Sequence, residues 1–238
     1  VAVYAFSSRA NEQRQELSQP FTQALPAGIS LLRVRVQTGT AQVDLLPSLQ
    51  AQAVSGEFLG SRQSGVDIDY VEEADGSATL TLHEAQAGAF PMLEALGRGA
   101  LRVELPTGVP LDVELLGTDG GANLNMAGLA VERMTVNLQR GNVLVTLPVY
   151  DPLFSQAEDT LGTIAALNGD ITVVVPDGLA ARLDLEREGS GIEPEYNPSL
   201  YDYLRPDTLQ SVSIRNATIT QRYVIAAPRG IIRVREVE

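Results

Sequence analysis

The chain has 238 residues, of which 30 are acidic and 17 are basic, so its formal net charge is −13. A surface this acidic repels phosphate backbones and anionic lipid, which argues against a nucleic-acid partner. The absence of cysteine excludes disulfides and thiolate metal sites. A bilayer span requires a run of about 18 to 20 apolar residues. The sequence contains no such run, so we expect no direct membrane insertion.

The N-terminal segment, residues 1–27, differs in pattern from the remainder of the chain. Residues 1–6 are apolar, and Arg9 to Leu17 is polar and tolerant of a helix that Pro20 would end. We therefore expect residues 1–27 to form an N-terminal arm with a short helix-like segment. The apolar start could be the end left by signal cleavage or the stub of a membrane anchor.

From residue 28 onward, apolar and polar residues alternate with the period of β-strands. Thr38-Gly39 is predicted to turn the chain between two strands, and Asp75-Gly76 to close a hairpin between Val66–Val71 and Ala78–Leu82. Glu84 to Gly97 reads as a helix-like break. With 5% aromatic residues and no tryptophan, the core must consist of Val, Leu, Ile and Ala.

One short phrase recurs along the chain. It starts with a glycine, continues with alternating aliphatic residues and usually ends in proline, which cannot donate to a sheet ladder. Its five copies start at Gly39, Gly99, Gly141, Gly169 and Gly230. The spacing of the glycines at 99, 141 and 169 suggests a common step of about 14. We predict an all-β, solenoid-like single domain over residues 28–238, a stacked β-repeat with short helical or irregular insertions.

Two interruptions of the alternation are candidate functional segments. The first is Asp151 to Gly162, and the second is a tyrosine-rich insert at about residues 187–210. Loops of this length in a compact β domain are often functional. The rings of Tyr196, Tyr201 and Tyr203 could cap the end of the β-stack or contact another molecule, since tyrosine favours interfaces.

The repeated phrases carry a resemblance to a known family. The Gly-Asn at 141–142, the Gly-Asp at 169–170 and the Pro-x-Gly turns at 106–108 and 176–178 resemble those of the bacterial putative-adhesin family, also called the toastrack domain. The resemblance covers roughly residues 28–186 and 211–237. It implies a stack of β-strands exposed outside the cytoplasmic membrane, often tied to surface contact or envelope-stress sensing, and brings no catalytic residues.

No other residues form a convincing catalytic, cofactor or metal site. The one histidine, His83, should point outward from its strand without a partner. Asp67 and Asp69 share a strand face near Glu72, Glu73 and Asp75, which fits a solvated acidic face better than a calcium loop. We expect no catalytic residues, no cofactor and no metal.

These observations predict a non-catalytic, extracytoplasmic β-repeat protein, secreted or on the cell surface, that serves surface contact, adhesion or self-assembly. Its partner would be another protein or a second copy of itself. The predicted contact residues are Val1, Val3, Tyr4, Phe6, Tyr196, Tyr201 and Tyr203. The apolar arm could add as a strand to a neighbour's sheet edge.

Two other functions stay open. One is a ligand-sensing or stress-sensing domain of a membrane-anchored regulatory protein. The other is a carbohydrate-active β-solenoid enzyme, which a groove holding carboxylates and arginines together would favour. Without tryptophan, such an enzyme would lack the usual stacking surface for sugars.

Overall fold

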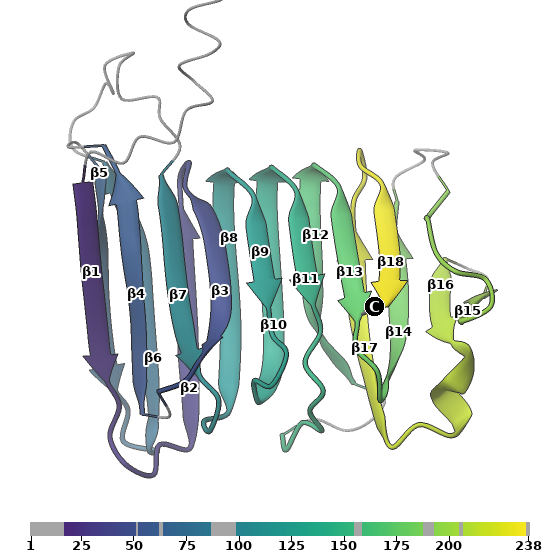
Figure 1. Cartoon of the computed structure of the whole chain (residues 1–238), viewed down its shortest axis with the longest axis horizontal. Coiled ribbons are helices and arrows are strands. Elements are labelled where there is room, and N and C mark those ends of the chain that lie inside the picture. Colours follow the sequence, from purple (N-terminus) through teal and green to yellow (C-terminus); the bar gives the residue numbers. More distant parts are fainter. Residues whose placement is uncertain are drawn as a thin grey trace, which may run out of the picture.

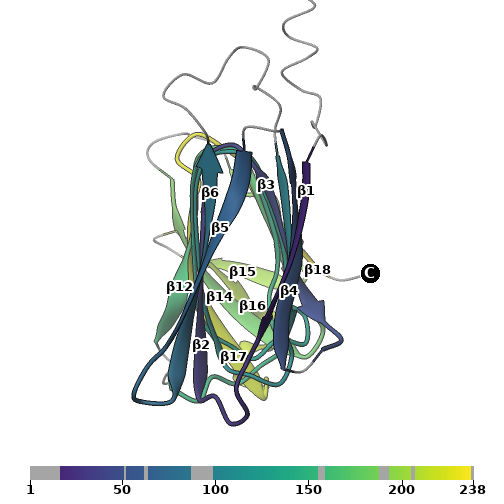
Figure 2. The same ribbon diagram turned by 90° about the vertical axis from the view of Figure 1, so that its left-hand side faces the viewer.

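The protein folds into two β-sheets packed face to face (Figures 1 and 2). The computed structural model describes residues 17–50, 52–61, 64–86, 99–154, 159–187, 193–204 and 207–236. Sheet A has eight strands in the order β1-β4-β7-β3-β9-β11-β13-β18, and sheet B has ten in the order β15-β16-β14-β17-β12-β10-β8-β2-β6-β5. The predicted all-β stack is confirmed.

The strands of sheet A are β1 (Leu17–Ala24), β4 (Ala53–Gly60), β7 (Ala100–Pro106), β3 (Gln42–Ser48), β9 (Ala122–Asn125), β11 (Val143–Thr146), β13 (Ile171–Val175) and β18 (Ile232–Glu236). Those of sheet B are β15 (Tyr201–Leu204), β16 (Thr208–Ser211), β14 (Leu179–Glu186), β17 (Ile219–Ala226), β12 (Thr160–Asn168), β10 (Val131–Arg140), β8 (Leu111–Asp119), β2 (Leu31–Thr38), β6 (Ser77–Gln86) and β5 (Ser64–Glu72). A 3-10 helix, η2 (Val212–Arg215), precedes β17.

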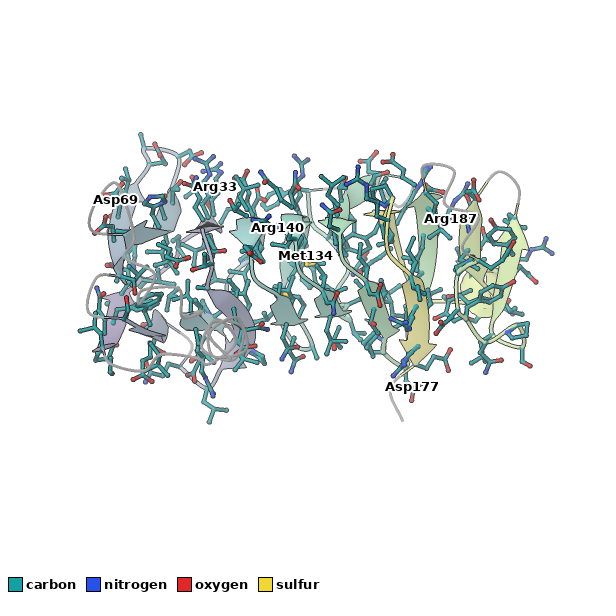
Figure 3. All side chains as sticks on the ribbon, turned by 90° about the horizontal axis from the view of Figure 1, so that it is seen from above. Arg33, Asp69, Met134, Arg140, Asp177 and Arg187 are labelled. Atoms are coloured by element: carbon teal, nitrogen blue, oxygen red, sulfur yellow. The ribbon has the colours of Figure 1, made fainter. Side chains whose placement is uncertain are left out.

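Most of the chain alternates between the sheets, so that one strand of each sheet and the turns between them make one rung. Neighbouring rungs are parallel and in register: Val143 of β11 lies beside Ala122 of β9 and Ile171 of β13. Alternate side chains point inward, and Figure 3 shows Met134 between the sheets while Arg33 and Asp69 project from the outer side of sheet B. The aliphatic side chains thus form one continuous core between the sheets.

The repeated phrase is the sheet A half of a rung. Its five copies contain β3, β7, β11, β13 and β18, and a sixth copy, Gly121 to Asn125, contains β9 and lacks the closing proline. The expected common step is wrong as a rung length. Gly120, Gly141 and Gly169 mark successive rungs at unequal intervals, because the sheet B strand and its turns vary in length.

Glycines form a column where the chain enters sheet A. A Cβ atom on Gly141 would collide with the carbonyl oxygen of Gly120, one on Gly169 with that of Gly141, and one on Gly230 with that of Gly169. Gly120 and Gly141 also have φ values of +140° and +126°, which strain L-residues. The rungs can approach this closely only because glycine has no side chain at these positions.

At two of the column glycines, Gly141 and Gly169, the residue that follows ties its rung to the next one. Asn142 Oδ1 accepts the N–H of Asp170 at 2.9 Å, and Asp170 Oδ1 accepts the N–H of Ile231 at 2.9 Å. The repeated Gly-Asn and Gly-Asp pairs therefore bond neighbouring turns to each other. At the turn between β2 and β3 a buried carboxylate does this instead: Glu84 accepts the N–H groups of residues 39, 40 and 41 at 2.7, 2.9 and 3.1 Å.

Two of the predicted turns have different outcomes. The hairpin around Asp75-Gly76 is confirmed, since β5 and β6 pair antiparallel on either side of it. The turn at Thr38-Gly39 does not fold the chain back alongside β2. It carries the chain into the other sheet, where β3 pairs with β7 and β9.

The expected boundary between the arm and the domain at residue 28 is wrong for residues 17–24. They form strand β1, which pairs antiparallel with β4 along its whole length. Pro20 does not end a helix here, because it lies in the terminal strand of a sheet, where a residue without an N–H is tolerated. Residues 1–16 lie outside the described residues, as does most of the expected helix-like break at Glu84 to Gly97.

Both ends of the stack carry groups that cover backbone edges. At one end the amide of Gln19 on β1 bonds both backbone groups of Val66 on β5, at 2.8 and 3.0 Å, and so links the two sheets. At the other end Glu195 bridges β18: its N–H bonds Ile232 O, and its carbonyl accepts the N–H of Val234. These contacts reduce the free edge on which strands of other chains could pair.

Replacing Gly141 by alanine should lower the free energy of unfolding by at least about 2 kcal/mol, because the new Cβ meets backbone that cannot move aside. Gly108→Ala is the matched control, since its Cβ would meet no atom within 4 Å. Urea unfolding followed by circular dichroism measures both. Equal stabilities of the two variants would contradict the steric requirement for glycine in this column.

Glu84→Gln should cost about 2 to 3 kcal/mol of unfolding free energy, because a neutral amide oxygen would replace the charged acceptor of three backbone N–H groups. Glu114→Gln on the outer face of sheet B, where the carboxylate pairs with Arg35 at 3.3 Å, should cost less than about 1 kcal/mol. Urea unfolding followed by circular dichroism measures the stability of both variants. A Glu84→Gln variant as stable as the control would refute the anchoring role.

Candidate binding groove on sheet A

The main candidate site is a groove of about 730 Å³ on the outer face of sheet A. It crosses β3, β9, β11, β13 and β18, which are adjacent and parallel. This volume lies within the range of known ligand sites. The lining side chains are Gln42, Asp44, Asn123, Asn142, Leu144, Asp170, Thr172, Arg233 and Arg235, with backbone at residues 121, 122, 141 and 143.

The parallel register places the central lining residues in one row. Asp44 lies beside Asn123, Asn123 beside Leu144, Leu144 beside Thr172, and Thr172 beside Arg233. The row runs across the strands with one side chain per strand, about 4.8 Å apart. The three middle positions are uncharged, and the charged residues stand at the two ends.

Several lining side chains have unused hydrogen-bonding capacity. Within the described part of the chain, the side chains of Asp44, Asn123, Thr172 and Arg235 make no hydrogen bond or ion pair. Leu144 is 42% exposed at the centre of the row. The groove therefore offers acceptors, donors and one apolar surface to a ligand.

The wall on the β18 side is held by ion pairs. Arg233 bonds Asp170 at 2.8 Å and Glu195 at 2.9 Å. The N–H of Ile231 and the Arg233 guanidinium hold the pKa of Asp170 below its ordinary value. These contacts fix the Arg233 guanidinium at the end of the row, whereas Arg235 beside it has no such partner among the described residues.

The groove does combine carboxylates with arginines, the pattern that would favour a carbohydrate-active enzyme. However, Asp44 and Asp170 belong to rungs three strand spacings apart, or about 14 Å. Glycoside hydrolysis by paired carboxylates needs about 5 to 10 Å between them. Asp170 is also engaged by Ile231 and Arg233. Asp44 and Asp170 are therefore too far apart to act as such a pair.

The tyrosine insert caps one end of the stack. Tyr201 on β15 is buried, and burial raises its pKa to about 12. Tyr196 and Tyr203 stack with ring centroids 6.3 Å apart and pack on the core while staying partly exposed. The Tyr203 hydroxyl and Arg187 both bond Asp207, which ties the β15–β16 hairpin to the end of β14. Contact with another molecule through Tyr196 or Tyr203 stays a prediction.

The other interruption, after residue 150, begins with an exposed apolar tip. Leu153 and Phe154 are 71% and 66% exposed, and their N–H groups bond the buried carboxylate of Glu132 at 3.1 and 3.0 Å. The Tyr150 hydroxyl bonds the same carboxylate at 2.7 Å. The tip is thus held in place by the scaffold. Residues 155–158 lie outside the described residues.

The other candidate residues that the structure describes do not converge on a site. The arm residues Val1, Val3, Tyr4 and Phe6 lie outside the described residues. His83 points outward from β6, and Asp67 and Asp69 point outward from β5. Within the described ranges, no three His, Asp or Glu side chains gather closely enough to hold a metal ion. The same residues contain no helix long and apolar enough to cross a membrane.

Comparison with known proteins identifies the fold as one seen in a protein described as an adhesion protein. No family model and no curated protein matches this chain. The crystal structure of a putative cell adhesion protein from Clostridium sporogenes shares the fold, with a TM-score of 0.75 and 14% identity over 93% of this chain and 100% of that one. A putative adhesin from Bacteroides fragilis matches at a TM-score of 0.32 and 10% identity, over 94% and 99% of the two chains.

The resemblance to putative adhesins that the repeated phrases carry is thus supported at the level of the fold. The sequence did not identify the groove, because its residues come from five separated strands. The only local sign of it is the polar residue at alternate positions of each phrase, such as Asn123 and Thr172, which any solvent-facing strand also shows.

Asp170→Asn should reduce stability at pH 7 by roughly 1 kcal/mol, because a charged acceptor of Ile231 and Arg233 is lost. A carboxyl with a lowered pKa stabilises the fold above its unfolded pKa, near 4, and this contribution disappears as pH falls through the folded pKa. The difference from wild type should therefore shrink as pH falls below about 4.

Urea unfolding at a series of pH values tests this expectation. Asp44→Asn is the control, because Asp44 has no bonding partner among the described residues. A difference between Asp170→Asn and wild type that stays constant down to pH 2 would contradict the assignment.

Proposed function

We propose that this chain is a non-catalytic surface-contact domain of the cell envelope, an adhesin-like module that meets its target through the groove on sheet A. The observation that carries the proposal is the row of side chains across five parallel strands, from Asp44 to Arg233, whose polar middle positions have no partner within the described ranges. The fold shared with a protein described as a putative cell adhesion protein supports it. An extracytoplasmic position, secreted or at the cell surface, follows from this role.

A sheet face suits this role better than the ends of the stack. Glu195 already occupies backbone groups of β18, and Gln19 occupies those of Val66 on β5. Outer-face side chains can vary without disturbing the inward row that forms the core. A rigid sheet therefore presents the groove at little entropic cost on binding.

Self-assembly through the arm residues Val1, Val3, Tyr4 and Phe6 is a separate proposal. It requires a receiving edge that the contacts of Gln19 and Glu195 leave open. Removing residues 1–8 and measuring the mass in solution by light scattering tests it: loss of an oligomer supports assembly through the arm, and an unchanged mass rules it out.

The groove proposal predicts that fluorescent beads coated with the protein are retained on bacterial or animal cell layers more than albumin-coated beads. Asn123→Tyr fills the groove beside the central Leu144 without changing charge and should reduce retention several-fold. Thr135→Tyr places the same side chain on the outer face of sheet B and should leave retention unchanged. Circular dichroism checks that both variants fold.

Two results would contradict the proposal. Wild-type beads retained no better than albumin beads would argue against a surface-contact role. Equal retention of wild type and Asn123→Tyr would show that contact does not involve this groove.

A further inference from the structure

We infer that the groove on sheet A binds an extended oligosaccharide lying across the strands. This inference rests on the proposed surface-contact function and names the chemical class of its target. Its basis is the combination of shape, available hydrogen-bonding groups and charge distribution in the groove.

The shape favours a long, regular ligand. The row of Asp44, Asn123, Leu144, Thr172 and Arg233 repeats once per strand, at about 4.8 Å. This spacing is close to the length of one sugar unit in an extended chain. A chain of several units laid along the row would meet a new side chain at almost every unit.

The chemistry of the row fits hydroxyl groups. The Asn123 amide can donate and accept, the Thr172 hydroxyl can do both, and the Asp44 carboxylate can accept two bonds from neighbouring hydroxyls. The exposed surface of Leu144 lies between Asn123 and Thr172, where the C–H face of a sugar ring can rest. An aliphatic side chain offers less contact than an aromatic ring, so we expect weak binding at a single site.

The charges restrict which polymer can bind. A net charge of −13 and the Asp44 carboxylate in the groove oppose nucleic acid and other polyphosphates. The middle of the row is uncharged, which suits neutral sugars. An acidic sugar would be placed at the β18 end, where Arg235 is a cation without a partner among the described residues.

A peptide is a poorer fit to this surface. Extended peptides bind mainly by adding to a sheet edge, whereas the groove lies on a sheet face whose backbone bonds are used within the sheet. Proline-rich peptides need aromatic grooves, and none of the described residues that line this groove is aromatic. The hydrogen-bonding side chains that remain suit hydroxyl groups.

An array of immobilised oligosaccharides, neutral and uronic-acid-containing, is the direct test, followed by calorimetric titration of the strongest binder. Asn123→Ala and Thr172→Ala should each weaken binding about 3- to 10-fold, the usual effect of losing one hydrogen bond. Thr135→Ala on the outer face of sheet B should not change it. If the binder is acidic, Arg235→Ala should weaken it, and a neutral binder should be insensitive to that change.

No array binding by the wild-type protein would overturn the inference, as would equal effects of Thr135→Ala and Thr172→Ala. If beads adhere to cells through the groove while the array shows no binding, the oligosaccharide inference is wrong and the surface-contact function is still supported. If the beads do not adhere to cells, the proposed surface-contact function is itself contradicted.

Discussion

The structure depends on how closely successive backbones approach where the chain enters sheet A. At Gly120, Gly141, Gly169 and Gly230 each turn lies directly against the carbonyl of its neighbour in the stack. A side chain there would push the rungs apart and break the parallel ladder. The glycine column is therefore a steric requirement of the stack, and the Asn or Asp that follows Gly141 and Gly169 adds a hydrogen bond across each step.

Close stacking in register has a consequence for the outer surface. Because β9, β11 and β13 align residue by residue, equivalent outward positions of separate phrases fall into straight rows. The inward positions are occupied by aliphatic residues that the core requires. The outward positions are free to vary, and on sheet A they form the groove between Asp44 and Arg235. The scaffold and the candidate site thus share one geometric cause.

The strand pattern of the central stack could be predicted from sequence, because period-two alternation and the Gly-to-Pro phrase report local geometry. The copy at Gly121 does not stand out because its strand is only four residues long and Leu124 is the one large aliphatic residue in it. Strand β1 was missed because its polar residues and Pro20 do not look like a strand, and only pairing with β4 makes them one. Such long-range pairing leaves no local mark.

The order of strands in the stack was beyond sequence reasoning for a similar reason. Strand β2 lies between β6 and β8, and β17 lies between β12 and β14, so neighbours in space are far apart in the chain. The groove depends on that order. Arg233 and Thr172 meet only because β18 pairs with β13, although several other strands lie between them in the sequence.

Hydrogen exchange measured by mass spectrometry tests most directly whether the stack is one cooperative unit. Amides in β8 to β13, from both sheets, should exchange with one common free energy equal to that of global unfolding, because they share a single core and a continuous ladder. Distinct and unrelated exchange free energies for the two sheets, or for successive rungs, would contradict the account.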